Sequence, residues 1–576
     1  MKIAMAQIAA VTGDLDGNAQ KVVQAIQQAR QRGCDLVVTP EAAITGYLSC
    51  DLLEVDAYVR ANKALLTQRI APEVRDLAAV VGFVDYEEGP DGAIRQRYNS
   101  AALIENGQVT NIAHKQHLCR FRFYDETRYF APGLRTNVAN VSLAGRQLRV
   151  AFLICEDLWE DRGYTNSPYR EACEAGADLI VAINASPFET GKWQQRLRVI
   201  EQHLAYKQVP LVYVNTVSIG DNLKDIILFD GRSMAFDGGA AMCGCGPLFA
   251  EDLVIVELDE QMRSTRTICP AWSQEEELFA ALTFGFREYC RQTGFSRAVL
   301  GVSGGIDSAL CAALAAEALG RENVLGVNLP SRYNSPETRS DAAVVCGNLG
   351  IDYAVIAIED LFHQVVSTFG QWKRPEKGVT IENFQARLRG ILLMGIANDT
   401  GRLVIATGNK SELGLGYCTL YGDMVGGLLL IGDLNKSDVY RLSAYINQRA
   451  GRDIIPESVI RRVPSAELRD KQVDPFDYPV VAPIVDDLIA RVDSETIMKR
   501  FLDRELDERY PSDLYDRYDE QSFRAVLTDT HRRYHNSAFK RSQASPIVIV
   551  SKRALGFDLR ETIINWWCKN DTQPPS

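Results

Sequence analysis

A Gly-Gly turn between an apolar run and a helix-like run constrains the fold of this chain more than any other feature. The sequence reads AVLGV, then SGGIDS at residues 303–308, then ALCAALAAEALG. Adjacent glycines allow a tight turn that gathers backbone N–H groups, and the helix that follows adds the positive end of its dipole. The pattern therefore predicts a loop that binds an anion.

The turn is not a Walker A loop, because it lacks G-x-x-x-x-G-K-[ST] and contains no lysine. Asp307 is instead a hard oxygen ligand of the kind that Mg²⁺ takes beside phosphates. The alternative is a turn that serves only the topology of the sheet. With Asp307, the turn resembles the pyrophosphate-binding loop of ATP pyrophosphatases. That resemblance implies an ATP site formed by Gly301, Val302, Ser303, Gly304, Gly305, Ile306, Asp307 and Ser308.

A second polar turn ends an apolar strand in LVIATGNKSELGLGY, residues 403–417. Open α/β sheets bind ligands at the carboxyl ends of their strands, so this turn is expected beside the first loop. Asp307 and Glu412 then form a two-carboxylate Mg²⁺ site. The structural alternative is a strand followed by a helix cap, since Asn and Ser are ordinary capping residues.

Four segments of the second half resemble NAD synthetases: ATGNKSE, ENFQARLRG at 382–390, YGDMVGGLLLIGDLNKSDVYRLSAY at 421–445 and HNSAFKRSQASP at 535–546. The resemblance covers most of residues 280–550. It implies a Rossmann-like, doubly wound parallel sheet that binds ATP and deamido-NAD. Thr407 and Lys436 are then ATP-binding residues, and Asn383, Glu412 and Lys540 contact deamido-NAD. Read without the family, the basic residues among them are solvated side chains.

The first half has a different organisation, with β-rich runs such as CDLVVTP and ADLIVAIN between helical stretches and loops. Residues 259–273 lose this periodicity and include a proline. We therefore expect two α/β domains, residues 1–260 and 281–576, with a linker at 261–280.

Three residues of the first domain lie beside apolar runs: Glu41 in VVTPEAAITGY, Lys115 in IAHKQHL and Cys155 in VAFLICEDLW. Singly, they have structural explanations, as a solvated Glu, a loop Lys and a buried thiol. As a set they resemble the Glu-Lys-Cys triad of the nitrilase superfamily, which implies an α-β-β-α sandwich. In such a triad a thiolate attacks an amide, a carboxylate transfers the proton to ammonia, and a lysine stabilises the oxyanion. We expect Lys115 to lower the pKa of Cys155.

Two further segments, YDETRYFAPG at 124–133 and NASPFETGKW at 184–193, resemble glutamine-dependent NAD synthetases. The resemblance implies that Ser186 and Lys192 hold the α-amino acid end of glutamine, and that Glu126 positions the reactants. Phe121 stands where some members have Tyr, so a hydroxyl contact from this position is in doubt. The glutamine-binding residues implied are Phe121, Glu126, Glu156, Ser186 and Lys192.

Composition excludes several other classes of protein. A net charge of −12 argues against a nucleic-acid partner, which needs clustered Lys and Arg. No run approaches the roughly 18 apolar residues of a spanning helix, and Gln7 interrupts the apolar N-terminal run, which argues against a signal peptide. Thirteen cysteines without a C-x-x-C pair indicate reduced thiols, and Cys243 and Cys245 lack partners for zinc. We expect a cytoplasmic homo-oligomer with no membrane partner.

The combined resemblance implies a glutamine-dependent NAD synthetase. Glutamine is hydrolysed at Cys155, and ATP adenylates the nicotinate carboxylate of deamido-NAD, because a free carboxylate is a poor acyl donor. Ammonia then displaces AMP. Two alternatives remain at this point: another ATP-dependent amidotransferase, and a nitrilase-like amidase with a regulatory nucleotide-binding domain.

Overall fold

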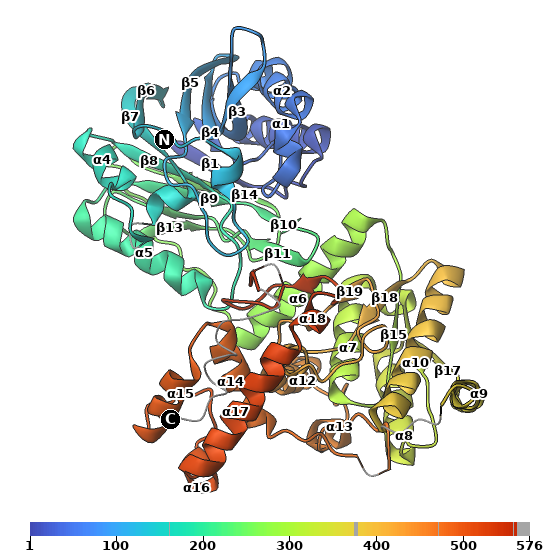
Figure 1. Ribbon diagram of the computed structural model, residues 1–576. Helices are drawn as coiled ribbons and strands as arrows, with labels where there is room; N and C mark the ends of the chain where they lie inside the picture. Colours follow the sequence, from blue (N-terminus) through green and yellow to red (C-terminus); the bar gives the residue numbers. More distant parts are fainter. Residues whose placement is uncertain (160–161, 374–377, 471, 557, 562–576) are drawn as a thin grey trace. The chain divides into compact units, whose positions relative to one another are not determined.

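The computed structural model describes residues 1–576 except 160–161, 374–377, 471, 557 and 562–576 (Figure 1). The chain divides into two compact units. The first contains Met1–Asn222 and Ile227–Trp272, and the second contains Leu223–Ile226 and Ser273–Ser576. The helix α6 (Gln274–Thr293) opens the second unit, so the C-terminal part of the predicted linker is helical.

Two six-stranded sheets form the centre of the first unit. In spatial order the first sheet contains β14 (Asp252–Glu257), β1 (Lys2–Gln7), β2 (Leu36–Val38), β3 (Ala78–Glu88), β4 (Ile94–Glu105) and β5 (Gln108–His114). The second contains β13 (Met242–Cys245), β12 (Met234–Phe236), β9 (Leu211–Asn215), β8 (Leu179–Asn184), β7 (Arg146–Ile154) and β6 (Asn137–Leu143). The strands β10 (Val217–Asp221) and β11 (Asp225–Asp230) follow β9 in the chain.

The two sheets pack face to face, and alternate side chains of the central strands point into the apolar layer between them. Met5, Val38 and Val80 of the first sheet share a buried core with Phe152 and Val181 of the second. The outer face of the first sheet is covered by α1 (Leu15–Gln31) and α2 (Asp56–Leu65), and that of the second by α4 (Pro168–Glu174) and α5 (Lys192–Tyr206) (Figure 1). This arrangement confirms the predicted α-β-β-α sandwich.

The second unit contains a parallel sheet in the order β20-β19-β18-β15-β16-β17. Asp225 and Ile226 pair with β20 at its edge. The chain runs outward from β15 through β16 to β17 and then returns to place β18 on the other side of β15. The strands are β15 (Ala298–Gly301), β16 (Val324–Asn328), β17 (Asp352–Val355), β18 (Leu403–Ala406), β19 (Leu428–Leu429) and β20 (Ile547–Val548).

Helices cover both faces of this sheet, as is usual for parallel strands. One face carries α6, α7 (Ile306–Leu319), α8 (Pro336–Leu349) and α12 (Lys436–Ala450), and the other carries α9 (Glu359–Gly370) and α10 (Gly378–Thr400). The short helix α11 (Lys410–Leu415) follows β18. The predicted doubly wound sheet is therefore confirmed. Its strand order reverses between β15 and β18, where such sheets form ligand-binding crevices.

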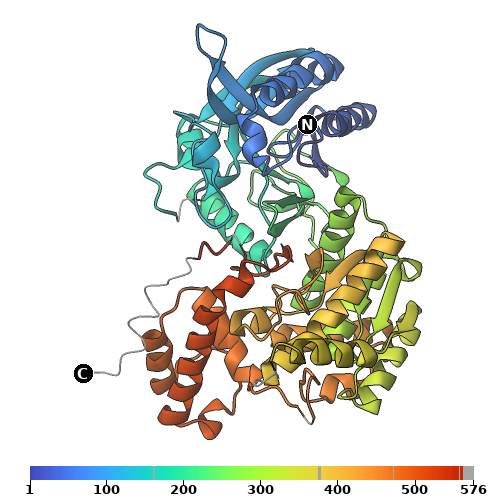
Figure 2. The ribbon, with the colours of Figure 1, turned by 45° about the vertical axis from the view of Figure 1, so that its right-hand side comes forward.

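A group of C-terminal helices, orange to red in Figures 1 and 2, forms a further layer of the second unit. Although residues 486–535 are rich in charged side chains, these helices bury an apolar core that includes Ile484, Ile497, Phe501 and Phe523. The group contains α13 (Glu457–Arg461), α14 (Tyr478–Ile489), α15 (Ser494–Leu502), α16 (Leu514–Arg517), α17 (Glu520–Asn536) and α18 (Ala538–Arg541).

The expectation of reduced thiols is wrong for one pair, because Cys245 and Cys269 form a disulfide. Their Cα atoms lie 5.7 Å apart although 24 positions separate them in the chain. Hydrogen bonds from Thr267 to the carbonyls of Met242 and Cys243 bring the two segments together. Among the helices that the structure describes, none combines the length and apolar character needed to cross a membrane.

Candidate active sites

In the first unit, Glu41 follows β2, Lys115 follows β5 and Cys155 follows β7. All three side chains are buried. Lys115 Nζ donates to Glu41 Oε1 at 2.7 Å and to Glu126 Oε1 at 2.8 Å. The structure therefore brings Glu126, at the start of α3 (Glu126–Tyr129), into contact with the lysine of the predicted triad.

The nucleophile candidate lies on a tight turn. Cys155 has φ +49° and begins a short 3₁₀ helix directly after β7. Asp157 fixes this turn, since one of its carboxylate oxygens accepts the N–H of Ile154 at 3.0 Å. The other oxygen accepts the N–H groups of Gln116 and His117, at 3.0 and 2.9 Å. Asp157 thus ties the cysteine turn to the lysine turn, a role that no motif in the sequence indicates.

The two carboxylates are held by backbone as well as side-chain donors. Glu41 Oε2 accepts the N–H of Ala185 at 2.7 Å, and Glu126 Oε2 accepts that of Cys119 at 2.7 Å. Tyr47 donates its hydroxyl to Glu126 Oε1 at 3.0 Å. These contacts fix both carboxylates at defined positions beside Lys115.

The expected lowering of the Cys155 pKa is wrong as a net effect, although Lys115 acts in the expected direction. Burial raises the pKa of the Cys155 thiol well above its usual value, and Glu41 raises it further, while Lys115 opposes them. Burial alone would lower the pKa of Lys115, but Glu126 and Glu41 raise it well above normal. The ammonium is thus shared between two carboxylates, and its effect on the thiol is too small to overcome desolvation. The resting thiol is protonated, so attack requires a base.

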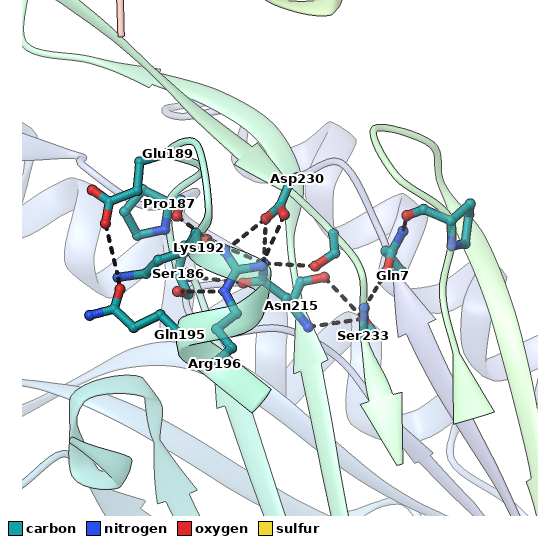
Figure 3. A network of polar contacts seen from close by, with 12 residues as sticks. Gln7, Ser186, Pro187, Glu189, Lys192, Gln195, Arg196, Asn215, Asp230 and Ser233 are labelled. Carbon is teal, nitrogen blue, oxygen red and sulfur yellow. Dashed lines mark hydrogen bonds and ion pairs between the residues drawn. The ribbon is translucent and has the colours of Figure 1, made fainter. Parts of the chain in front are cut away.

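Ser186 is held by a fully buried Arg196 (Figure 3). Arg196 forms a bidentate ion pair with Asp230, at 2.9 and 2.8 Å, and donates to the hydroxyl and carbonyl oxygens of Ser186, at 3.1 and 2.8 Å. Asn215 Oδ1 accepts the N–H of Ser186 at 2.8 Å. Arg196, Asp230 and Asn215 come from separate segments, and sequence reasoning did not identify them.

Lys192 begins α5 and is buried. Its Nζ donates to Gln195 at 3.1 Å, lies 3.8 Å from a carboxylate oxygen of Glu189, and is 4.4 Å from the centre of the Trp159 ring (Figure 3). Burial lowers the pKa of Lys192 to about 8, although Glu189 opposes the shift. This lysine can therefore lose its charge just above neutral pH.

Phe121 and Glu156 both contact Arg162. The guanidinium lies 4.1 Å from the centre of the Phe121 ring and 3.5 Å from Glu156 Oε1. Glu156 is buried, which raises its pKa, and it accepts the hydroxyl of Tyr164 at 3.1 Å. The aromatic ring and the carboxylate predicted for the glutamine pocket thus share one cation.

In the second unit, the SGGIDS loop joins β15 to α7. Gly304 has φ +85°, and a Cβ there would lie 2.1 Å from the carbonyl oxygen of Thr338, so this position needs glycine. Ser308 Oγ accepts the N–H of Ser303 at 3.2 Å and donates to the carbonyl of Gly305 at 2.9 Å. Side-chain contacts within the loop therefore fix its shape.

Asp307 and Glu412 follow the adjacent strands β15 and β18 and share Lys436. Lys436 Nζ lies 2.6 Å from Asp307 Oδ2 and 3.6 Å from Glu412 Oε1. Asn409 contacts both carboxylates, because its Nδ2 donates to Asp307 at 2.8 Å and its N–H to Glu412 at 3.1 Å. Burial and the neighbouring charge of Asp307 together raise the pKa of Glu412 to about 8.

Two neighbouring cavities, of about 210 and 240 Å³, open at this point of the sheet. The first is lined by Asp307, Glu412 and Lys436, and the second by Gly301 and Val302. The described residues contain no cluster of three or more His, Cys, Asp or Glu side chains that could hold a metal ion. Both cavities share the wall residues Ser303, Asn334, Thr407, Asp423 and Ala466. A ligand in one can therefore meet a ligand in the other.

Asn383 and Lys540 contact the loop that follows α11. Lys540 Nζ donates to the carbonyls of Gly416 and Cys418, both at 2.7 Å, and Asn383 Oδ1 accepts the hydroxyl of Thr419 at 2.8 Å. Cys418 lines the first cavity. Lys540 therefore lies one step behind the cavity wall, and Asn383 contacts Thr419, the residue next to Cys418 in the chain.

Comparison with known proteins assigns both halves of the chain. The carbon-nitrogen hydrolase family model matches residues 2–267, and the NAD synthase model matches residues 278–528. The Thermotoga maritima protein "Glutamine-dependent NAD(+) synthetase" is 35% identical over 603 residues, covering 98% of each chain. The Synechocystis protein of that name is 36% identical, covering 97% of this chain and 98% of its own. A solved structure of the Acinetobacter baumannii glutamine-dependent NAD+ synthetase with ADP matches with 32% identity and a TM-score of 0.73, covering 98% of this chain and 99% of that one.

Proposed function

The chain belongs to the glutamine-dependent NAD(+) synthetases, and from this premise we propose which of its residues carry out each half of the reaction. The enzyme is a carbon–nitrogen ligase that amidates deamido-NAD to NAD. It uses ATP and ammonia released from glutamine, and the other products are AMP, pyrophosphate and glutamate. Residues 1–260 form the glutaminase domain, 261–280 the linker and 281–576 the synthetase domain in this proposal.

Glutamine hydrolysis takes place at Cys155. Because the thiol is protonated at rest, Glu41 accepts its proton as Sγ attacks the amide carbon, and Lys115 stabilises the oxyanion. Glu41 then returns the proton to the departing nitrogen. Ammonia is released, and the acyl group remains on Cys155 as a thioester. Water hydrolyses the thioester to glutamate and restores the thiol. Glu126 positions Lys115 throughout, which the 2.8 Å contact between them supports.

The α-amino acid end of glutamine is held by Ser186 and Lys192, with Phe121 and Glu156 completing the pocket. Lys192 is a buried cation that can pair with the α-carboxylate. The Arg196–Asp230 ion pair supports this assignment, because it fixes Ser186 through both of its oxygen atoms. Burial of these groups strengthens their electrostatic contacts with the substrate.

ATP binds at the loop of residues 301–308, with Thr407 on the shared cavity wall and Lys436 at the phosphates. Asp307 and Glu412 would hold Mg²⁺, which neutralises phosphate charge as pyrophosphate leaves. The donor set fits this ion, since Asp307 and Glu412 are neighbouring carboxylates that would supply the hard oxygen ligands Mg²⁺ takes beside phosphates. Lys436 then exchanges its carboxylate partners for phosphate.

The nicotinate carboxylate of deamido-NAD attacks the α-phosphate, forming an acyl-adenylate and releasing pyrophosphate. Ammonia then attacks the acyl carbon and displaces AMP. Asn383, Glu412 and Lys540 are the proposed contacts of deamido-NAD, and the contacts of Asn383 and Lys540 with the loop after α11 support an additional role in shaping this wall.

The observation that carries the proposal is the pairing of a buried lysine–carboxylate centre in one unit with a glycine-turn phosphate loop in the other. NAD formation from deamido-NAD, ATP and glutamine, with stoichiometric pyrophosphate and glutamate, tests it. Pyrophosphate release from ATP without deamido-NAD would instead indicate that another group accepts the adenylyl group. A cytoplasmic location and a homo-oligomeric state stay predictions, which fractionation and light scattering would check.

A further inference from the structure

Asn99 lies in the middle of β4 and contacts both carboxylates of the glutaminase centre, although no motif in the sequence indicates it. It pairs with Val84 of β3 and is 2% exposed. Its carbonyl oxygen accepts the N–H of Lys115 at 2.9 Å. The backbone of Asn99 therefore holds Lys115, whose ammonium group is proposed to stabilise the oxyanion.

The side-chain amide of Asn99 forms a second bridge between the carboxylates. Nδ2 donates to Glu41 Oε1 at 2.7 Å and to Glu126 Oε1 at 3.2 Å. These are the same two oxygens that accept from Lys115 Nζ. Each oxygen is thus contacted by both an ammonium group and an amide group.

The orientation of this amide is determined by its surroundings. Reversing it would place Oδ1 against two carboxylate oxygens, which repel it, so only the present orientation is compatible with Glu41 and Glu126. In this orientation Oδ1 is buried and has no hydrogen-bond partner among the residues that the structure describes. A buried acceptor without a partner costs about 1–3 kcal/mol. A side chain chosen only for stability would avoid that cost.

We propose that Asn99 is a positioning residue of the glutaminase reaction, which holds Glu41 and Glu126 side by side and keeps Glu41 ionised and aimed at Cys155. The inference rests on the proposed role of Glu41 as the base. Two carboxylates beside one ammonium carry a net negative charge in a buried site, and such a pair tends to take up a proton. Two further N–H donors favour the charged form. Consistent with this, the hydrogen bond from Asn99 acts to lower the pKa of Glu41, against the larger effect of burial.

Two variants at this position separate a positioning role from a structural one. Asn99→Leu keeps the number and branching of side-chain heavy atoms and removes both donors, so kcat for glutamine hydrolysis should fall by about 10²-fold, while KM for glutamine changes less than about twofold. The acid limb of the kcat profile should move to higher pH, because Glu41 loses a donor to its charged form. Asn99→Asp keeps the shape, and its alkaline limb should move to lower pH as the new carboxyl group loses its proton.

The matched control is Asn62→Leu. Asn62 is also buried in the first unit, and its amide contacts only backbone groups of Val59 and Val84. It should lower the melting temperature and leave the pH profile in place. NAD synthesis from ammonium salt, measured in the same preparations, should be unchanged in all three variants.

The proposal is overturned if kcat of Asn99→Leu stays within twofold of the parent, or if it falls with an unmoved acid limb. If Asn99→Leu fails to fold, Asn99→Asp provides the test. An alkaline limb that does not move to lower pH in Asn99→Asp then overturns the proposal. Cys155→Ala distinguishes failure of the underlying assignment, because glutaminase activity that survives this change removes the proposed nucleophile, whatever the Asn99 variants do.

Discussion

The glutaminase centre and the ATP centre are each built on a lysine between two carboxylates, but the two differ in exposure. The side chains of Lys115 and Glu41 are 0% exposed, and that of Glu126 is 6% exposed. Lys436 is 3% exposed, whereas Asp307 and Glu412 are each 19% exposed and line a cavity. The charged groups of the glutaminase centre are buried, whereas those of the ATP centre line a cavity where a ligand can contact them.

The difference follows from the substrates. The reacting amide of glutamine is neutral and brings no charge of its own, so the charged groups of the first centre must be fixed in place before the oxyanion forms. ATP brings several negative charges, and the proposed Mg²⁺ would bring positive ones, so the proposed role of the second centre requires it to exchange partners on binding. Groups that exchange partners have to remain accessible. Similar residue types therefore serve as a fixed catalytic centre in one unit and as an ion-binding wall in the other.

Cys155→Ala is the strongest way to separate the two centres. Glutamine-dependent NAD synthesis should fall by about 10⁴-fold or more, because the nucleophile is lost, while synthesis from ammonium salt should persist. Both rates are measured as NAD formed. Cys173→Ala, which removes another buried thiol of the first unit, should leave both rates unchanged. A parallel fall of both activities in folded Cys155→Ala would contradict the separation.

Asp307→Asn tests the ATP centre. Pyrophosphate release should fall by about 10²-fold or more with either nitrogen source, because a proposed Mg²⁺ ligand loses its charge. Asp399→Asn, at an exposed position of α10, provides the matched control. Wild-type pyrophosphate release by Asp307→Asn would exclude this residue from the metal site.

The exposed centre should also respond to pH through Glu412. Its pKa is raised to about 8, and only the ionised carboxylate binds Mg²⁺, so the ion should bind about fivefold more weakly at pH 7 than at pH 8. Titrating Mg²⁺ against pyrophosphate release at the two pH values measures this. The dependence should flatten in Glu412→Gln. Equal Mg²⁺ affinity at pH 7 and pH 8 in the parent enzyme would show that Glu412 is not the group involved.

The smallest expected effect concerns the binding of glutamine by Lys192 in the first unit. Because the pKa of Lys192 is lowered to about 8, its charge is half lost at that pH, and KM for glutamine should rise about twofold between pH 7 and pH 8. Lys192→Arg keeps its charge and should show a flat KM over this range. If the parent enzyme has a constant KM, Lys192 does not bind the α-carboxylate.

The fold and the general location of both centres could be predicted from the sequence, because they depend on local pattern. Apolar runs that end in Glu41, Lys115 and Cys155 mark strand ends, and the glycine turn at 303–308 marks the passage from strand to helix. Both are properties of consecutive residues. They were sufficient to predict two α/β domains, whereas the sandwich and the family were implied by the resemblance of these motifs to known families.

Contacts between distant segments were decided only by the tertiary structure. Asn99, Asp157 and Arg196 occur in ordinary strand and helix sequence, and their roles arise because the sheets bring them against Glu41, Lys115 and Ser186. The Cys245–Cys269 disulfide has the same origin. The pKa of Cys155 was predicted in the wrong direction for a related reason. Desolvation depends on every atom that packs around a group, and a sequence shows only its neighbours along the chain.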